Sequence, residues 1–148
     1  DATGGIVVAG NTNGRLEDGV SIGEFDAFVR KYASNGTPLW THQFGSTARD
    51  TASSVSVDTF GDVIVAGSAG THDLETPSGG SEAYVRAYAT DGTLVWTRHF
   101  GSAGRDHVHA VDVDTSGNLF VAGVTDGTLH GQTSMGGTDA FVMMLVRP

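Results

Sequence analysis

The stretch GNLFVAG at residues 117–123 occurs twice before in nearly the same form, as GDVIVAG at residues 61–67 and as GGIVVAG at residues 4–10. Successive copies begin 57 and 56 positions apart. Trp40 and Trp96, which lie in a second shared segment, are also 56 positions apart. A strand-like segment that recurs at a fixed interval is the signature of a repeat protein, in which each copy is one supersecondary unit. The sequence therefore predicts a repeat of about 56 residues over nearly the whole chain.

Each repeat contains four short runs with strand character. The first alternates apolar and polar residues, as in SSVSVD at residues 53–58, and the second is the VAG segment. The third is of the FDAFVRKY type at residues 25–32, and the fourth is of the LVWTRHF type at residues 94–100. Turns of the SNG and TDG kind join the third and fourth runs and suit a backbone with positive φ. No segment shows a helical apolar period, so we predict an all-β chain.

Some of these runs are apolar at every position rather than at alternate positions. Residues 63–66 and residues 141–145 carry only apolar side chains. A strand with one wet face would alternate, so an unbroken apolar run predicts burial on both faces. Antiparallel sheets that cover one another on both faces are typical of β-propeller blades, whereas a two-layer sandwich leaves one face of each sheet polar. We therefore expect β-propeller blades of four antiparallel strands. A β-trefoil is the alternative architecture, but it would need three complete units, and a chain of 148 residues is too short for three repeats of about 56 residues.

The first and last repeats do not contain all four runs. The chain supplies the last three runs of one repeat, then a full set of four, then the first three of another. This predicts a single β-propeller segment over residues 1–148, with an incomplete blade at residues 1–50, a full blade at residues 51–106 and an incomplete blade at residues 107–148. About two and a half blades do not close a ring. We therefore expect as partners either other blades of the same longer chain or identical copies.

The composition excludes several classes of partner. Acidic residues outnumber basic residues by 17 to 8, which gives a formal net charge of −9. An acidic surface argues against nucleic acid and anionic membranes as partners. No apolar run approaches the roughly 20 residues that a membrane-spanning helix needs, so we expect no membrane insertion. Cysteine is absent, which excludes disulfides and thiolate metal sites.

Several spaced motifs together resemble a known family. AVDVDTSGNLFVAGVTDG at residues 110–127, GGTDAFVMML at residues 136–145 and the linking DGTLVWTRHFGSAGRDHVHAV at residues 91–111 resemble the bacterial β-propeller repeat family known as SBBP. They are more loosely similar to NHL-type blades, which share the strand–D-x-x-G-N–strand hairpin. The resemblance implies a propeller fold and an extracellular or cell-surface bacterial setting. It implies no activity, because propellers carry many unrelated functions.

Asp112, Asp114 and Ser116 form a candidate calcium site. Oxygen-bearing side chains at alternate positions resemble the start of a calcium loop, in which hard ligands converge on the ion. The glutamate expected at position 12 of such a loop is replaced by Gly123, and the matching loop SVDTFGD has serine and phenylalanine at two ligand positions. A plain Asx-type turn explains the same residues, with Asp114 bonding backbone amides. Calcium is the one cofactor that the sequence suggests; otherwise we expect none.

The segment RDHVH at residues 105–109 gathers further polar side chains. On a regular strand His107 and His109 would share a face and could bind a metal, although a zinc site needs a third ligand. The other copy, RDTAS at residues 49–53, has no histidine. We expect the shared Arg–Asp pair to act as a structural latch between the fourth strand and the next blade.

Other recurring residues are explained by the repeat itself. Asp26, Glu82 and Asp139 begin the third run of each repeat, and although paired carboxylates serve glycosidases, acids repeated in every blade are expected to maintain it. We expect Trp40 and Trp96 to pack between blades, with sugar stacking as the alternative. No Ser–His–Asp order, phosphate-binding loop or dinucleotide fingerprint is present. We therefore predict that the chain is not an enzyme.

Three long loops between the second and third runs differ among the repeats, at residues 11–24, 68–80 and 124–137. Variable loops on a rigid scaffold are where binding specificity is built. We therefore expect a non-catalytic secreted or cell-surface propeller module with a structural role or a role in binding a protein or glycan ligand. The alternatives are a carbohydrate-binding lectin that closes its ring by oligomerisation, and a fragment of a polysaccharide-active enzyme.

Overall fold

The computed structural model describes residues 1–17, 19–70, 80–129 and 131–147. These residues form ten strands and three antiparallel sheets, of three, four and three strands. The prediction of an all-β chain is confirmed for the described residues. Within the same residues, no helix has the length and apolar character needed to cross a membrane.

Strands that follow one another in the chain pair as neighbours within each sheet. The first sheet contains β1 (Ile6–Thr12), β2 (Asp26–Tyr32) and β3 (Pro38–Phe44), in that order. The middle sheet contains β4 (Thr51–Val57), β5 (Val63–Ala69), β6 (Glu82–Tyr88) and β7 (Leu94–Phe100). The last sheet contains β8 (Asp106–Val113), β9 (Leu119–Thr125) and β10 (Asp139–Leu145).

The turn between the third and fourth strand types uses glycine as the sequence predicts. In the β6–β7 turn, the Ala89 N–H donates to the Thr93 carbonyl oxygen at 2.8 Å. Gly92 has a φ of 91° and Gly36, in the β2–β3 turn, has a φ of 84°. Glycine adopts this left-handed conformation without the steric cost that a Cβ brings. At Gly92 a Cβ would also lie 2.8 Å from the ring of Trp40.

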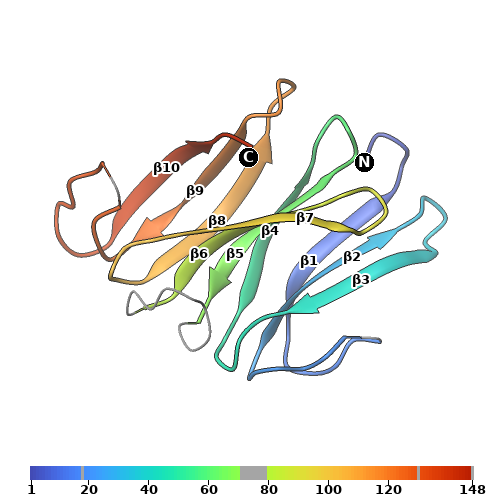
Figure 1. Ribbon diagram of the computed structural model, residues 1–148, viewed down its shortest axis with the longest axis horizontal. Coiled ribbons are helices and arrows are strands. Elements are labelled where there is room, and N and C mark those ends of the chain that lie inside the picture. The colour runs from blue at the N-terminus through green and yellow to red at the C-terminus, as the bar shows by residue number, and fades with distance from the viewer. Residues whose placement is uncertain (18, 71–79, 130, 148) are drawn as a thin grey trace.

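The middle sheet lies between the first and the last sheet (Figure 1). Two hydrophobic clusters hold the sheets together, one on each face of the middle sheet. The cluster towards the first sheet contains Ala27, Val29, Ala52, Val63, Val65, Ala69, Tyr84 and Tyr88. The cluster towards the last sheet contains Ile64, Ala66, Ala83, Val85, Ala87, Val108, Val111, Leu119, Val121, Leu129, Phe141 and Leu145. Every residue of β5 is buried, which confirms the burial on both faces predicted for residues 63–66.

The unbroken apolar run at residues 141–145 behaves differently. In β10, Phe141 and Leu145 are buried, whereas Val142 and Met144 are 73% and 56% exposed. The prediction of burial on both faces is therefore wrong for this run. The physical reason is that only one face of the last sheet has a neighbouring sheet in the described structure.

Candidate functional site

A buried aspartate closes the turn that follows β7. Asp106 has no exposed surface, and its carboxylate accepts hydrogen bonds from the Ser102 backbone N–H at 2.6 Å and the Ser102 hydroxyl at 3.2 Å. The Asp106 N–H donates to the Ser81 carbonyl oxygen at 2.9 Å, just before β6. Gly101 permits this approach, since a Cβ there would lie 2.6 Å from the carboxylate. We call Ser102 and Asp106 a Ser–Asp latch, because they fasten the end of β7 to the start of β8.

The preceding repeat has an equivalent Ser–Asp latch, formed by Ser46 and Asp50. The Asp50 carboxylate accepts from the Ser46 backbone N–H at 2.7 Å and from the Gly70 N–H at 3.2 Å. Its backbone N–H donates to the Phe25 carbonyl oxygen at 2.8 Å. Burial raises the pKa of Asp50, although the hydrogen bonds from Ser46 and Gly70 oppose this rise. The latch predicted for the Arg–Asp pair is thus confirmed for the aspartate.

The arginine of the same pair makes a different contact in each copy. Arg105 Nε donates to Asp126 at 2.7 Å from a side chain that is 69% exposed. The Arg49 guanidinium instead lies over the Phe25 ring, 4.6 Å from its centroid. A hydrogen bond from Thr138, and then the one from Arg105, lower the pKa of Asp126. Exposed pairs of this kind contribute little to stability, so the latch depends on the serine and the aspartate.

Two of the three predicted calcium ligands, Asp112 and Asp114, make separate contacts, and the third, Ser116, donates its backbone N–H to Asp114. Asp114 Oδ1 accepts from the backbone N–H groups of Ser116 at 2.9 Å and Asn118 at 2.8 Å, and Oδ2 accepts from the Asn118 amide at 2.7 Å. These bonds, led by those from Asn118, lower the pKa of Asp114. Asp112, on β8, accepts instead from the Ser56 hydroxyl of β4 at 3.1 Å. Calcium binding by these residues stays a prediction.

The turn around Asp114 is built in the same way in all three repeats. Asp58 Oδ1 accepts from the backbone N–H groups two and four residues later at 2.8 and 2.9 Å. Asp1 Oδ1 does the same at 2.9 and 2.7 Å. Gly61 and Gly117 stand at the same place in their turns, with φ of 86° and 84°. The recurring bonds give this aspartate turn a structural role in every repeat.

The second carboxylate oxygen of each turn has its own partner. Lys31 Nζ lies 3.2 Å from Asp1 Oδ2. Arg147 donates to Asp58 Oδ2 and lies 3.5 Å from Asp62.

Among the residues that the structure describes, no three histidine or acidic side chains form a group that could hold a metal ion.

His107 and His109 do not lie on a regular strand. The pairing of β8 with β9 shifts between Val108 and Ala110, which leaves His109 as the extra residue of a β-bulge. The shared face predicted from simple alternation therefore has no basis in the observed register. His107 Nε2 lies 3.2 Å from the Ser81 hydroxyl, at the start of the middle sheet's third strand.

The acids that begin the third strands anchor the loops that precede them. Asp26 accepts from two backbone N–H groups of its loop, each at 3.1 Å, and from the Gln43 amide of β3 at 2.8 Å. Asp139 accepts from the Ser134 hydroxyl at 2.8 Å. These contacts are consistent with the expected role of the acids in maintaining each repeat.

The third of these acids, Glu82, belongs to a polar cluster between the first and middle sheets. Glu82 Oε2 lies 3.9 Å from His99 Nδ1, and the Arg86 guanidinium lies 4.1 Å from the centroid of the Phe44 ring. Burial lowers the pKa of His99, Glu82 raises it and Arg86 lowers it, while burial raises the pKa of Tyr84. The cavity beside these side chains measures about 20 Å³, which is room for about one water molecule. Sequence analysis does not identify the cluster, because its members come from three strands.

Both tryptophans pack between sheets, as predicted. Trp40 packs against the cluster of the first and middle sheets, and its Nε1 donates to the Thr90 carbonyl oxygen at 3.1 Å. Trp96 packs against the cluster of the middle and last sheets.

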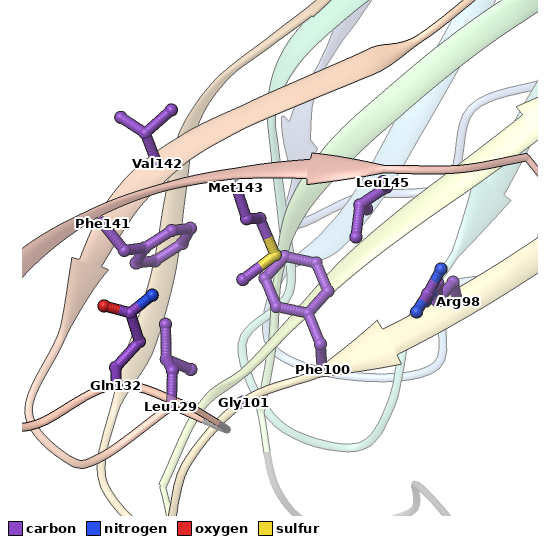
Figure 2. Close-up of a pocket in the computed structure, with 9 residues that line it drawn as sticks. All are labelled: Arg98, Phe100, Gly101, Leu129, Gln132, Phe141, Val142, Met143 and Leu145. Carbon is purple, nitrogen blue, oxygen red and sulfur yellow. The ribbon is translucent and has the colours of Figure 1, made fainter.

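A larger cavity lies between β7 and β10. It measures about 230 Å³. Its lining residues are Arg98, Phe100, Gly101, Leu129, Gln132, Phe141, Val142, Met143 and Leu145. Figure 2 shows Phe141 and Met143 directed from β10 towards Phe100 of β7, with Val142 pointing to the opposite side of the strand.

The described parts of the variable loops lie beside the Ser–Asp latches, since Gly23 approaches Ser46 and Gly127 approaches Ser102. Of the three loops, residues 18, 71–79 and 130 lie outside the described residues. Gly80 and Gly127 both approach the backbone of Gly104 in the latch turn. A cavity of about 160 Å³ lies in the last loop, with Thr133 and Ser134 among its polar lining residues.

Residues 95–129 match the model of the SBBP family, which is described as a beta-propeller repeat. Over this span the chain is similar to an SBBP β-propeller repeat. The match confirms the resemblance found in the sequence. A curated relative, "Regulatory protein FlaEY" of Caulobacter vibrioides, is 33% identical over 107 residues, which cover 66% of this chain and 11% of the relative. The chain thus spans about a tenth of the length of that relative.

The matched SBBP repeat contains the two structural devices described above. Its span begins within β7 and ends in the loop after β9. It includes the latch of Ser102 and Asp106 and the aspartate turn of Asp114. The residues that recur in this SBBP repeat therefore serve its folding, and the loops are where its copies differ.

Proposed function

We propose that this chain is a non-catalytic β-propeller module in which the three sheets are blades that pack against further blades. One comparison supports this proposal most directly. Val85 and Ala87 in the middle sheet are 0% and 1% exposed, whereas the repeat-equivalent Val142 and Met144 in the last sheet are 73% and 56% exposed. The same apolar positions are therefore covered where a neighbouring sheet exists and open where it does not. Exposed apolar surface of this kind is typical of an interaction site.

The first sheet also has an exposed apolar face, on the side that faces away from the middle sheet. Ile6 and Val8 are 54% and 41% exposed, and their equivalents Val63 and Val65 are fully buried against the first sheet. A blade before the first sheet and a blade after the last sheet would thus meet two different surfaces. Contacts of this kind are head-to-tail, and they close a ring or continue as an open array. The added blades would belong to the same longer chain or to identical copies.

The binding role of the proposed module belongs to the loop end of the stack. The loops differ among repeats, while the latches that support them recur. The relative is named a regulatory protein, and regulation by binding needs no catalytic group. We propose a protein or glycan ligand and an extracellular or cell-surface bacterial setting, in keeping with the SBBP resemblance. The polar cavity of about 160 Å³ in the last loop favours a lectin as the second candidate.

Duplication of the middle repeat tests the proposed stacking. One further copy of residues 51–106, inserted after residue 106, adds a sheet and an inter-sheet interface. Because the stability of repeat proteins grows with such interfaces, we expect a higher urea midpoint for the extended chain. A control insertion carrying Ile64→Lys and Val85→Lys in the added copy removes the apolar contacts and is expected to give no increase. Equal midpoints for the parent chain and the unmodified extended chain would contradict stacking.

A further inference from the structure

A pocket of about 180 Å³ lies between the aspartate turns of the first two repeats. It is lined by residues 1–3, by residues 58–61, by Lys31 of β2 and by Thr90 of the β6–β7 turn. Figure 1 shows the N-terminal residues beside the turn that joins β4 to β5. Because neighbouring strands are antiparallel, these turns lie at one end of the stack and the Ser–Asp latches lie at the other. The pocket is therefore separate from the loop end.

Buried charged side chains form part of the pocket wall. Lys31 Nζ lies 3.2 Å from Asp1 Oδ2, and the two side chains are only 4% and 6% exposed. The Asp58 side chain has no exposed surface and is paired with Arg147. In the next repeat the position of Lys31 holds the apolar Ala87. Because a buried ion pair is often no more stabilising than the apolar residues that replace it, the Lys31–Asp1 pair is better explained by recognition than by stability.

The Asp1 side of the pocket has the geometry of the other aspartate turns. The amino group of Asp1 donates to the Gly5 carbonyl oxygen at 2.8 Å. The backbone N–H of Asp58 donates in the same way to the Asp62 carbonyl oxygen at 3.0 Å. An ordinary peptide N–H thus makes this bond in the equivalent turn. The shape of the wall follows from the turn and not from the free amine.

Phe60 places an exposed aromatic ring at the edge of the pocket. It is 77% exposed and is not among the described residues of either hydrophobic cluster. The turn uses its backbone N–H, which donates to Asp58 Oδ1 at 2.8 Å. The equivalent residues Thr3 and Ser116 make the same backbone bond without a ring. The turn therefore does not need the phenyl group, whose large apolar face is suited to stacking on a ligand.

The polar groups beside this ring are those that can hold a sugar. Thr90 Oγ1 donates to the Gly61 carbonyl oxygen at 3.0 Å, and its own oxygen can still accept from a ligand hydroxyl. The ammonium group of Lys31 carries three donors. Both carboxylates of the wall, Asp1 and Asp58, are paired with a cation, which favours an uncharged ligand. The volume is below the roughly 300–1,000 Å³ of pockets for drug-sized ligands, which suits a single ring.

The next pair of aspartate turns carries a larger side chain at the position of Thr90. Arg147, its repeat equivalent, donates to Asp58 Oδ2 and lies 3.5 Å from Asp62. The pocket thus lies where the shorter threonine side chain stands. An arginine at this position is compatible with the repeat, which makes Thr90→Arg a suitable variant for filling the pocket.

We propose that the pocket between the first two aspartate turns binds one uncharged pyranose ring, which stacks on Phe60 while its hydroxyl groups contact Lys31 and Thr90. This site goes beyond the proposed function, because it lies at the turn end of the stack and involves neither the variable loops nor the open sheet faces. Failure of sugar binding here would leave the result of the repeat duplication unchanged.

An NMR titration of the isotope-labelled chain with three uncharged glycosides tests the proposal. The probes are methyl β-D-glucopyranoside, methyl β-D-galactopyranoside and methyl α-D-mannopyranoside. We expect at least one of them to shift the amide signal of Gly61 saturably, with a Kd below about 10 mM. Phe60→Ser keeps the turn, since serine stands at position 116, and is expected to weaken binding at least about tenfold. The matched control, Phe120→Ser, removes a ring that is 41% exposed on β9 and should leave binding unchanged.

A second pair of variants places the bound sugar. Thr90→Arg fills the pocket and is expected to prevent saturation below about 100 mM, whereas Thr115→Arg adds the same charge at an exposed position of the third aspartate turn and should bind like the wild type. Urea unfolding checks that the variants are folded, and the two phenylalanine variants decide if Thr90→Arg is not. Three results overturn the proposal: no saturable shift with any glycoside, equal effects of Phe60→Ser and Phe120→Ser, or a saturable Gly61 shift with methylguanidinium but with no glycoside, which would show a cation site.

Discussion

Replacement of Asp106 by alanine is expected to destabilise the chain strongly, because it removes one whole Ser–Asp latch. The buried carboxylate accepts two hydrogen bonds from Ser102, at 2.6 and 3.2 Å. Removal of the acceptor leaves the Ser102 N–H without its partner in a buried turn. An unsatisfied buried group costs about 1–3 kcal/mol and a hydrogen bond to a charged group contributes about 1.5–3 kcal/mol. Because both figures describe partly the same lost bond, the expected loss is less than their sum, roughly 2–4 kcal/mol.

Urea unfolding followed by tryptophan fluorescence measures this loss. For a slope of about 2 kcal/mol per M urea, a loss of roughly 2–4 kcal/mol lowers the midpoint by about 1–2 M. The matched control is Arg105→Ala, the neighbouring residue of the same motif, whose side chain is 69% exposed in an ion pair with Asp126. We expect it to change the free energy of unfolding by no more than about 1 kcal/mol. Equal effects of the two substitutions would refute the assignment of the latch to the aspartate.

Three further predictions concern other parts of the repeat. Burial lowers the pKa of His99 from 6.5, so the folded state binds a proton at this histidine less readily than the unfolded state does. The neutral histidine therefore contributes to the free energy of unfolding above pH 6.5, and this contribution is lost as the pH falls through the lowered pKa. Unfolding of His99→Gln should accordingly depend less on pH in that window than unfolding of the wild type, and identical pH profiles would contradict the lowered pKa. Gly92→Ala should destabilise more than Gly36→Ala: both need positive φ, at about 1–2 kcal/mol, but only Gly92 lies against Trp40. Equal urea midpoints for these two variants would disprove the contribution of that contact. Calcium addition followed by EGTA should leave the melting temperature unchanged, because Asp114 already accepts bonds from its own turn; a calcium-dependent rise that Asp114→Ala abolishes would establish the metal site instead.

The strand pattern follows from the sequence because alternation and turn residues are local properties. The repeat aligns Val85 with Val142, and both lie in strands as the pattern predicts. The sequence does not show that Val85 is fully buried and Val142 is 73% exposed. Exposure depends on whether a neighbouring sheet is present, and two valines in similar local sequence carry no information about it. Burial read from apolar runs was therefore correct for β5 and wrong for β10.

The site residues show the same division between local and non-local information. The aspartate turn of Asp114 was recognisable, because its donors lie two and four residues away. The bulge at His109 was not, since it depends on how β8 pairs with β9. The pattern of residues also does not predict the carboxylate–serine contact of Asp106, although the recurring glycine before the serine is a usable signal. Gly101 and its counterpart Gly45 each leave room for a carboxylate that a Cβ would displace.

The mass of the chain in solution, measured by light scattering after size exclusion over a range of concentrations, tests the central claim most directly. If the open sheet faces are blade-packing surfaces, the wild type will associate as its concentration rises, and Val142→Lys combined with Met144→Lys will remain monomeric. The control is Val20→Lys combined with Met135→Lys, which adds the same charge at exposed loop positions and should associate like the wild type. A wild type that is monomeric at every concentration, or association that survives the Val142 and Met144 substitutions, would contradict the account.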